Sequence, residues 1–272
     1  MEEFNTIETT LFVPMLGRIW CTENHPSVLN DQKALSLRGA IPQELKQHAK
    51  GTAYTNIASA VRSTNMDRYI QDFMKENPEG VIVQIGCGLE TTYYRNDDGR
   101  HEWVELDLPE VIGFRKKILG ETERDHCLAG DATTAEWITE VRKMYPTQPL
   151  LVTASGVFYY FTEEMVMGLM KNLHQDGNAE LVFDTVSGFG MKLMHHLMKL
   201  VGHADAAIYF YVDKARQLAT EVGATLLKEE KYYKFISRKG LPFQCKVNMY
   251  LSDLMKMTKM VHLKFQSPDS KL

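Results

Sequence analysis

The chain has 272 residues, of which 44% are hydrophobic and 24% are charged, and its formal net charge is −4. These proportions are typical of a soluble globular protein that is long enough to bury a substantial core. The mild negative charge and the lack of a long stripe of Lys and Arg argue against nucleic acid as a partner.

Cysteine usage and the first residues bear on the compartment. The four cysteines are far apart and form no Cys-x-x-Cys pair, which argues against a zinc site and against a disulfide framework. The first residues lack the basic region and apolar stretch of a signal peptide, and no run approaches the ~20 apolar residues that span a membrane. We therefore expect a cytoplasmic protein without a bound metal or a membrane partner, present as a monomer or a homodimer.

Residues 1–77 are predicted to be helical. Within them, Ile57–Met74 carry apolar residues at helical spacing, and no segment shows a strong strand pattern. The tetrapeptide Asn77–Gly80 is typical of a turn that ends a helix. We expect residues 1–77 to form an N-terminal helical lid on a core of residues 78–272, within one compact domain.

From residue 80 onward, short apolar runs alternate with helical segments. Strands are predicted at 80–86, 101–107, 125–129, 149–155 and 179–185. Helices are predicted at 108–120, 134–144 and 163–175. Such alternation is typical of parallel βαβ units with helices on both faces of the sheet. The predicted fold class is therefore α/β, with a doubly wound sheet that is mostly parallel.

The remaining chain is predicted to add a lid insertion and to complete the sheet. The insertion covers residues 188–212 and begins with a helix over 188–203. The elements expected after it are a helix at 213–222, a strand at 225–236, a helix at 243–257 and a closing antiparallel strand at 260–265.

The most informative feature is an apolar run that stops at Gly86-Cys87-Gly88. Glycines at such a point permit a sharp turn after a buried strand and let a ligand approach the backbone closely. About twenty residues later, a second apolar run ends in Asp107, a spacing that suits a carboxylate on a ribose. Since ligands of open α/β sheets bind beyond the carboxyl ends of the strands, the pair predicts a cofactor that carries a nucleoside.

The glycine-rich loop favours S-adenosylmethionine over the phosphate-bearing cofactors. A dinucleotide loop has a third glycine where this chain has Thr91, and Glu90 would place negative charge near a pyrophosphate. No Gly-Lys-Ser/Thr sequence follows, which excludes a P-loop. S-adenosylmethionine has no phosphate and needs only close backbone approach and an acid for its ribose.

Four blocks of sequence, in order along the chain, carry a resemblance to a known family. They are Ala60–Asp67, Val83–Arg95, Val104–Ile112 and Ala154–Phe161. In these blocks the chain resembles the class I O-methyltransferases that group leucine carboxyl methyltransferases with bacterial polyketide O-methyltransferases. The resemblance implies a Rossmann-like methyltransferase fold with S-adenosylmethionine as the cofactor.

The resemblance also implies roles for individual residues. Arg62 would pair with the methionine carboxylate of the cofactor, Asp107 would bind the ribose hydroxyls, and Tyr160 would lie near the transferred methyl group. The further cofactor-binding residues that it implies are Gly86, Cys87, Gly88, Leu108, Gly130, Asp131, Ala132 and Ser155. Of these, Asp131 and Ala132 would lie near the adenine. The family usually has Glu where this chain has Ser155, so cofactor contacts are expected to differ there.

Other interpretations of some of these residues stay open. Asp131 would also suit the cap of the helix that follows it, and Tyr160 lies in an aromatic run that is typical of core packing. Cys87 has no visibly paired His, which favours a packing role. His195 is a candidate base for a substrate hydroxyl, although the adjacent pair His195 and His196 lacks the i, i+4 spacing of a helical metal site.

The predicted function is an O-methyltransferase of secondary metabolism, acting on a carboxylate or hydroxyl of a small aromatic or apolar molecule. A carboxylate is ionised at neutral pH and needs no general base, whereas a hydroxyl does. The apolar and aromatic residues of 188–212 are expected to help choose the acceptor. The alternatives are a methyltransferase for a protein C-terminal carboxylate, a homologue that binds S-adenosylmethionine without catalysis, and an NAD-dependent oxidoreductase.

Overall fold

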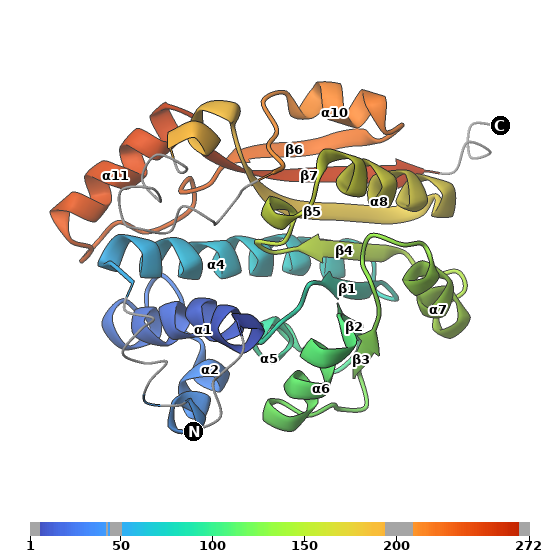
Figure 1. The fold of residues 1–272 in the computed structure, drawn as a ribbon, viewed down its shortest axis with the longest axis horizontal. Helices are drawn as coiled ribbons and strands as arrows, with labels where there is room; N and C mark the ends of the chain where they lie inside the picture. Colours follow the sequence, from blue (N-terminus) through green and yellow to red (C-terminus); the bar gives the residue numbers. More distant parts are fainter. Residues whose placement is uncertain (1–5, 42, 44–50, 194–208, 267–272) are drawn as a thin grey trace.

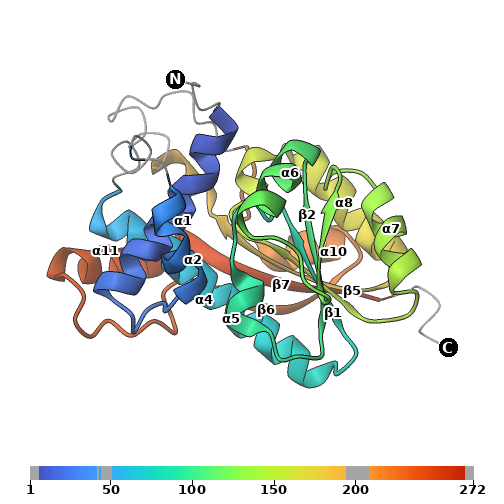
Figure 2. The same ribbon diagram turned by 90° about the horizontal axis from the view of Figure 1, so that it is seen from below.

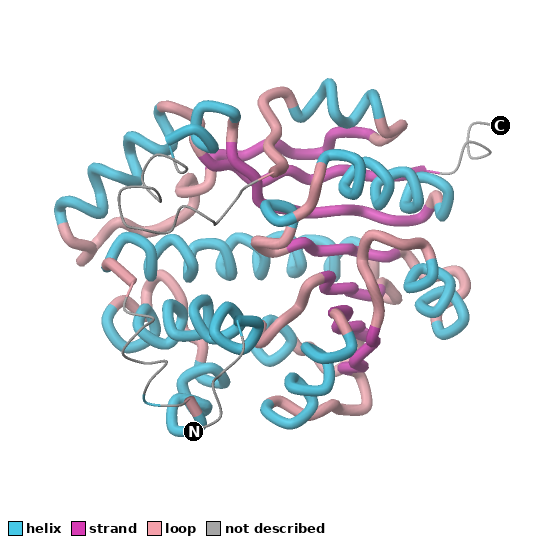
Figure 3. Tube along the Cα trace, in the orientation of Figure 1, coloured by secondary structure: helices cyan, strands magenta, loops and turns pink. Residues whose placement is uncertain are grey.

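The computed structural model describes residues 6–41, 43, 51–193 and 209–266. In this part of the chain, seven strands form one sheet in the order β3-β2-β1-β4-β5-β7-β6 (Figures 1 and 3). The strands are β1 (Val81–Ile85), β2 (Glu102–Asp107), β3 (Asp125–Ala129), β4 (Leu150–Ala154), β5 (Asn178–Val186), β6 (Thr225–Lys231) and β7 (Thr258–Gln266). The pairs among β1 to β5 are parallel, and β7 runs antiparallel to both of its neighbours.

The apolar runs form buried strands because helices cover both faces of the sheet. All five residues of β1 are buried, with Val83 packing on one face and Ile82 on the other. The first face is covered by α7 (Glu136–Met144), α8 (Glu163–Asp176) and α10 (Ala215–Glu221). The second is covered by α4 (Ala53–Glu76), α5 (Thr92–Asn96) and α11 (Phe243–Leu254). Figure 2 shows α4 and α5 on the opposite side of the sheet from α7 and α8.

The first helices lie beyond the carboxyl ends of the parallel strands (Figure 1). These are α1 (Thr6–Asn24), α2 (Gln32–Ser36) and the 3-10 helix η1 (Leu37–Ala40). Phe12 and Met15 of α1 share a small apolar cluster with Leu89, in the loop after β1, and with Phe114 of α6 (Pro109–Ile118). This cluster brings α1 over the glycine-rich loop. In the described ranges, no helix has the length and apolar character needed to cross a membrane.

The doubly wound, mostly parallel sheet with an antiparallel closing strand is confirmed, with β7 inserted between β5 and β6. One boundary of the prediction is wrong. The strand expected at 225–236 ends at Lys231, since Tyr232 and Tyr233 leave the ladder and bury their rings. The Tyr232 hydroxyl then donates to the carbonyl of Ala58 in α4 at 2.9 Å.

The helix expected at 243–257 and the insertion expected at 188–212 agree with the structure only over part of their length. The helix expected at 243–257 ends at Leu254, where the chain turns through Lys256 with a φ of 51°. In the insertion expected at 188–212, residues 188–193 are helical, and residues 194–208 lie outside the described part of the chain. The division into a lid of residues 1–77 and a core stays a prediction. Within that lid, α4 packs along β4 and β5.

Candidate active site

A cavity of about 420 Å³ lies at the carboxyl ends of β1, β2 and β4. This is the point where the strand order reverses, because β1 pairs with β2 on one side and with β4 on the other. Open α/β sheets bind ligands at such a point, and the volume is that of a small-molecule site. Eight of the predicted site residues line it: Arg62, Gly86, Cys87, Gly88, Asp107, Leu108, Ser155 and Tyr160.

The glycine-rich loop presents bare backbone to this cavity. Gly86 has a φ of 60° and Gly88 a φ of 47°, a region that side chains rarely adopt. A Cβ on Gly86 would also lie 2.5 Å from Cγ2 of Val157, so even a methyl group has no room. Cys87 between them is buried, and burial raises the pKa of its thiol, which fits packing rather than chemistry.

Asp107 ends β2 beside this loop and holds it in place. One carboxylate oxygen accepts from the amide of Gly88 at 2.8 Å, and the other accepts from the amide of Leu108 at 2.8 Å. Burial raises the pKa of this half-buried carboxyl, and the two backbone donors oppose the rise. A carboxylate has about four lone-pair sites, so Asp107 keeps acceptor capacity for hydroxyl groups of a ligand.

Arg62 reaches the cavity from α4 and is paired with Asp184 of β5. Its Nε lies 3.0 Å from Oδ2 of Asp184, a carboxylate that also accepts from the Tyr159 hydroxyl at 2.8 Å and the Gly156 amide at 2.7 Å. Burial lowers the pKa of Arg62, but the Asp184 carboxylate outweighs it, so the guanidinium stays charged. A Cβ on Gly156 would overlap the Arg62 guanidinium.

The two adjacent tyrosines of the loop after β4 have different surroundings. Tyr159 is buried and bonded to Asp184, whereas Tyr160 is 68% exposed and lines the cavity. The alternative that Tyr160 packs in the core is therefore wrong. Its role near the transferred methyl group stays a prediction. Ser155 also lines the cavity but offers a hydroxyl where the family usually offers a carboxylate.

Three predicted residues lie outside the lining of the cavity. The amide of Gly130 donates to the carbonyl of Asp107 at 2.9 Å, which keeps the loop after β3 beside the site. Asp131 is exposed, and its carboxylate accepts from the amide and hydroxyl of Thr133 at 2.8 Å. It caps a turn rather than a helix, because α7 begins only at Glu136. Ala132 is buried beside it. Their adenine-binding roles remain predictions, and His195 lies outside the described residues.

Two further charged residues line the cavity: Glu90, which the sequence already places in the glycine-rich loop, and Arg18, which was not predicted. Arg18 of α1 is 1% exposed, and its Nη1 lies 2.6 Å from Oε1 of Glu90. Arg18 Nε also lies 3.2 Å from Oδ2 of Asp31, and Nη2 donates to the carbonyl of Leu89 at 2.8 Å. Burial raises the pKa of Glu90, but Arg18 and Arg95 outweigh it and hold that pKa below its usual value. No local pattern marks Arg18, because an arginine on a helix is usually a solvated surface charge.

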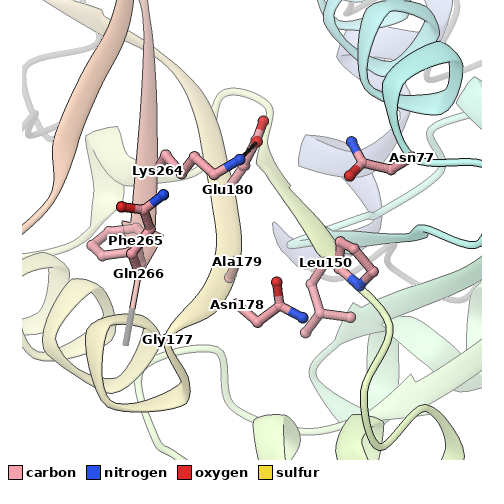
Figure 4. Close-up of a pocket in the computed structure, with 10 residues that line it drawn as sticks. Asn77, Leu150, Gly177, Asn178, Ala179, Glu180, Lys264, Phe265 and Gln266 are labelled. Atoms are coloured by element: carbon pink, nitrogen blue, oxygen red, sulfur yellow. Dashed lines mark hydrogen bonds and ion pairs between the residues drawn. The ribbon is translucent and has the colours of Figure 1, made fainter. Parts of the chain in front are cut away.

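A smaller cavity, of about 250 Å³, lies at the edge of the sheet formed by the N-terminal ends of the parallel strands, where β4 and β5 begin (Figure 4). Asn77, Asn178 and Glu180 are among its lining residues. The ammonium of Lys264 donates to Oε1 of Glu180 at 3.0 Å on its wall. This edge is not where parallel α/β sheets bind cofactors. Among the described residues, no group of three or more His, Cys, Asp or Glu side chains is placed to hold a metal ion.

The larger cavity at the carboxyl ends fits the parts of S-adenosylmethionine. Two glycines leave room for close backbone approach, Asp107 offers acceptors for ribose hydroxyls, and Arg62 offers a fixed cation for a carboxylate. S-adenosylmethionine has no phosphate for the partly buried Glu90 carboxylate to repel, and that carboxylate is already paired with Arg18. The residues present therefore suit this cofactor.

Comparison with known proteins agrees with this chemistry. A sequence model of the leucine carboxyl methyltransferase family matches residues 15–174, which is more than half of the chain. The tetracenomycin polyketide synthesis O-methyltransferase TcmP of Streptomyces glaucescens is 23% identical over 229 residues, covering 82% of each chain. Two solved structures share the fold. A DUF574 family protein from Streptomyces avermitilis has a TM-score of 0.58 at 13% identity, covering 92% of this chain and 96% of that chain. A SAM-dependent methyltransferase from Anabaena variabilis has a TM-score of 0.52 at 11% identity, covering 75% and 86%.

Proposed function

Because the chain belongs to the leucine carboxyl methyltransferase family and takes S-adenosylmethionine as its methyl donor, we propose that it methylates an oxygen of a small apolar or aromatic molecule. The acceptor oxygen is a carboxylate or a hydroxyl. One observation carries the proposal: the cavity at the reversal of strand order joins a polar, glycine-lined floor to an apolar wall. TcmP, named as an O-methyltransferase, supports oxygen as the acceptor atom.

The polar floor is proposed to hold the cofactor. Arg62 takes the methionine carboxylate, the bare backbone of Gly86 and Gly88 lies along the methionine portion, and Asp107 takes the ribose hydroxyls. The support for each role is its position on the cavity lining and its fixed geometry. Asp131 and Ala132 are proposed to border the adenine, next to Gly130, whose amide is tied to Asp107.

The apolar wall is proposed to hold the acceptor. It combines Leu11 and Pro14 of α1 with Leu108, Val111 and Phe161 from the loops and helix at the strand ends. Apolar side chains of this kind favour an acceptor that gains by leaving water. Tyr160, exposed at the same lining, is proposed to border the methyl group and to orient the acceptor.

Methyl transfer is an in-line displacement for which the bound sulfonium supplies an activated methyl group. The protein has to align the acceptor oxygen with that methyl group, and orientation alone can supply several kcal/mol. A carboxylate acceptor is already ionised at neutral pH, whereas a phenol with a pKa of about 10 needs a base. We keep His195 as the candidate base for a hydroxyl acceptor, and a carboxylate acceptor would make it unnecessary.

The test is transfer of a labelled methyl group from S-adenosylmethionine to a panel of aromatic and aliphatic carboxylic acids, phenols and peptides with free C-termini. We expect turnover with at least one apolar acid or phenol. A rate that stays level from pH 6 to pH 8 would identify a carboxylate, and one that rises with pH would identify a hydroxyl. Turnover restricted to peptides would contradict the proposal, as would tight cofactor binding without turnover on any small acceptor.

A further inference from the structure

A buried arginine lies directly beneath the glycine-rich loop. Arg115 of α6 has no solvent-exposed side-chain surface. Its Nη1 donates to the carbonyl of Gly88 at 3.1 Å and to the carbonyl of Glu90 at 2.7 Å. A single guanidinium nitrogen therefore holds two carbonyls of the loop that lines the cofactor cavity.

The other end of the same guanidinium is paired with β2. Nη2 of Arg115 lies 3.0 Å from Oε1 of Glu105, a side chain that is also fully buried. Glu105 precedes Asp107 by two residues on the same strand. A buried ion pair gains little net stability, because desolvation of the two charges offsets their attraction. The pair is thus better explained by what it positions than by what it stabilises.

Gly88 is held on both sides by these contacts. Its amide donates to Asp107, and its carbonyl accepts from Arg115. Gly86 and Gly88 have no side chains and lose more conformational freedom on ordering than other residues. Without external restraints, such a loop samples conformations that do not match a ligand, and each of them lowers the affinity.

We propose that Arg115 is a positioning residue of the cofactor site, holding the Gly86–Glu90 loop, together with Glu105, in its cofactor-binding conformation. The inference rests on the proposed placement of the cofactor at this loop. Arg115 is not among the residues that line the cavity, so it does not touch the cofactor. It acts through the backbone of Gly88 and Glu90, which its fork geometry can hold at two points while it also pairs with a carboxylate.

A second arginine, at the N-terminal ends of the parallel strands, offers a matched control for Arg115. Arg142 of α7 also donates to two loop carbonyls, those of Tyr145 at 3.1 Å and Gln148 at 2.6 Å. It pairs with the carboxylate of Asp176 through Nε and Nη2. Arg142 also donates to the carbonyl of Asn178 at 3.2 Å. Arg115 and Arg142 therefore each hold two loop carbonyls through Nη1 and pair with one carboxylate, but of the two only Arg115 does so at the cofactor cavity.

The experiment compares Arg115→Lys with Arg142→Lys in the full-length protein. Calorimetric titration with S-adenosylhomocysteine gives Kd, and urea unfolding gives the stability of each variant without ligand. We expect Arg115→Lys to raise Kd at least tenfold, because lysine keeps the charge and loses the fork. Both variants are expected to lower the free energy of unfolding by similar amounts. Arg142→Lys is expected to leave Kd within twofold of the value for the unmodified protein. Equal Kd values in the two variants would overturn the inference.

A second variant and a second measurement cover the case in which Arg115→Lys fails to fold. Glu105→Gln keeps the side-chain shape and is expected to raise Kd about threefold and to speed amide hydrogen exchange of the loop peptide in the absence of ligand. Unchanged Kd and exchange in Glu105→Gln would overturn the inference. The Asp107→Ala variant separates the two proposals: if it weakens binding while the Arg115 and Glu105 variants bind normally, only this inference fails. If Asp107→Ala binds normally, the proposed site itself is wrong.

Discussion

The two ends of the parallel strands β1 to β5 are built in different ways. We call the row of their C-terminal ends the carboxyl edge of the sheet and the row of their N-terminal ends the amino edge. At the carboxyl edge, the chain turns through the left-handed glycines Gly86 and Gly88 and leaves its backbone facing a cavity. At the amino edge, side chains close the loops, as Arg142 does by binding two carbonyls and Asp176. The carboxyl edge is suited to receive a ligand, and the amino edge is suited to hold strands and helices together. Binding and stability should therefore respond to different substitutions.

Two aspartates of neighbouring strands show the same contrast. Asp107 ends β2 and accepts hydrogen bonds from two backbone amides. Asp125 begins β3, is fully buried, and has no hydrogen-bond donor to either carboxylate oxygen among the residues that the structure describes. Burial raises the pKa of both carboxyls, that of Asp125 to about 6. The Asp107 carboxylate is held in place at the cavity and keeps acceptor capacity. The Asp125 carboxyl is buried, and its ionisation lowers the stability of the fold.

The largest expected effect distinguishes two left-handed glycines, one at each edge. Gly86→Ala meets both an unfavourable φ and the Val157 side chain, so we expect Kd for S-adenosylhomocysteine to rise at least hundredfold. Gly99, with a φ of 76° and open space around it, precedes β2 at the amino edge. Gly99→Ala is expected to cost about 1–2 kcal/mol of stability and to leave Kd unchanged. The two variants are compared by calorimetry and urea unfolding, and equal effects on Kd would remove the distinction between the edges.

The next effect concerns the acid at the carboxyl edge. Asp107→Ala removes the proposed acceptor for the ribose hydroxyls and the restraint on the Gly88 amide. We expect Kd for S-adenosylhomocysteine to rise at least tenfold, about 1.4 kcal/mol, in a protein that remains folded by circular dichroism. The control is Asp125→Asn on the next strand, which should bind like the unmodified protein. Unaltered affinity in Asp107→Ala would contradict the ribose assignment.

The last effect is on stability at the amino edge, and we expect no change in Kd there. Because the folded-state pKa of Asp125 is raised from 3.8 to about 6, its protonated form contributes stability that is complete below pH 3.8 and is lost as pH rises through about 6. Asp125→Asn should therefore remove a fall of about 2 kcal/mol in the free energy of unfolding between pH 4 and pH 6. The exposed Glu79→Gln serves as the control in urea titrations at several pH values. An unchanged pH profile in Asp125→Asn would show that this carboxyl is not the source of the fall.

The sequence predicts the features that depend on neighbouring residues. The strands from Val81 to Val186 follow from short apolar runs, and the site at Gly86, Gly88 and Asp107 follows from glycines and an acid that end two of them. These signals are local, since a buried parallel strand needs apolar residues along its whole length and a ligand-binding turn needs glycine at a fixed place.

Features that depend on distant contacts could not be predicted in this way. Arg18 and Glu90 are 72 residues apart and meet only because α1 folds over the glycine-rich loop. The place of β7 inside the sheet depends on pairing with both β5 and β6, which its own sequence does not specify. The role of Arg115 could not be predicted either, because its helix has the sequence of an ordinary charged segment. Its contact with the glycine-rich loop exists only in the folded structure.

The placement of the cofactor is tested most directly by a crystal structure of the protein grown with S-adenosylhomocysteine. We expect ligand density in the cavity at the carboxyl ends of β1, β2 and β4, with the ribose hydroxyls within hydrogen-bond distance of the Asp107 carboxylate and the homocysteine carboxylate at Arg62. Ligand bound at the amino edge of the sheet, or at the carboxyl edge without contact to Asp107, would contradict this placement.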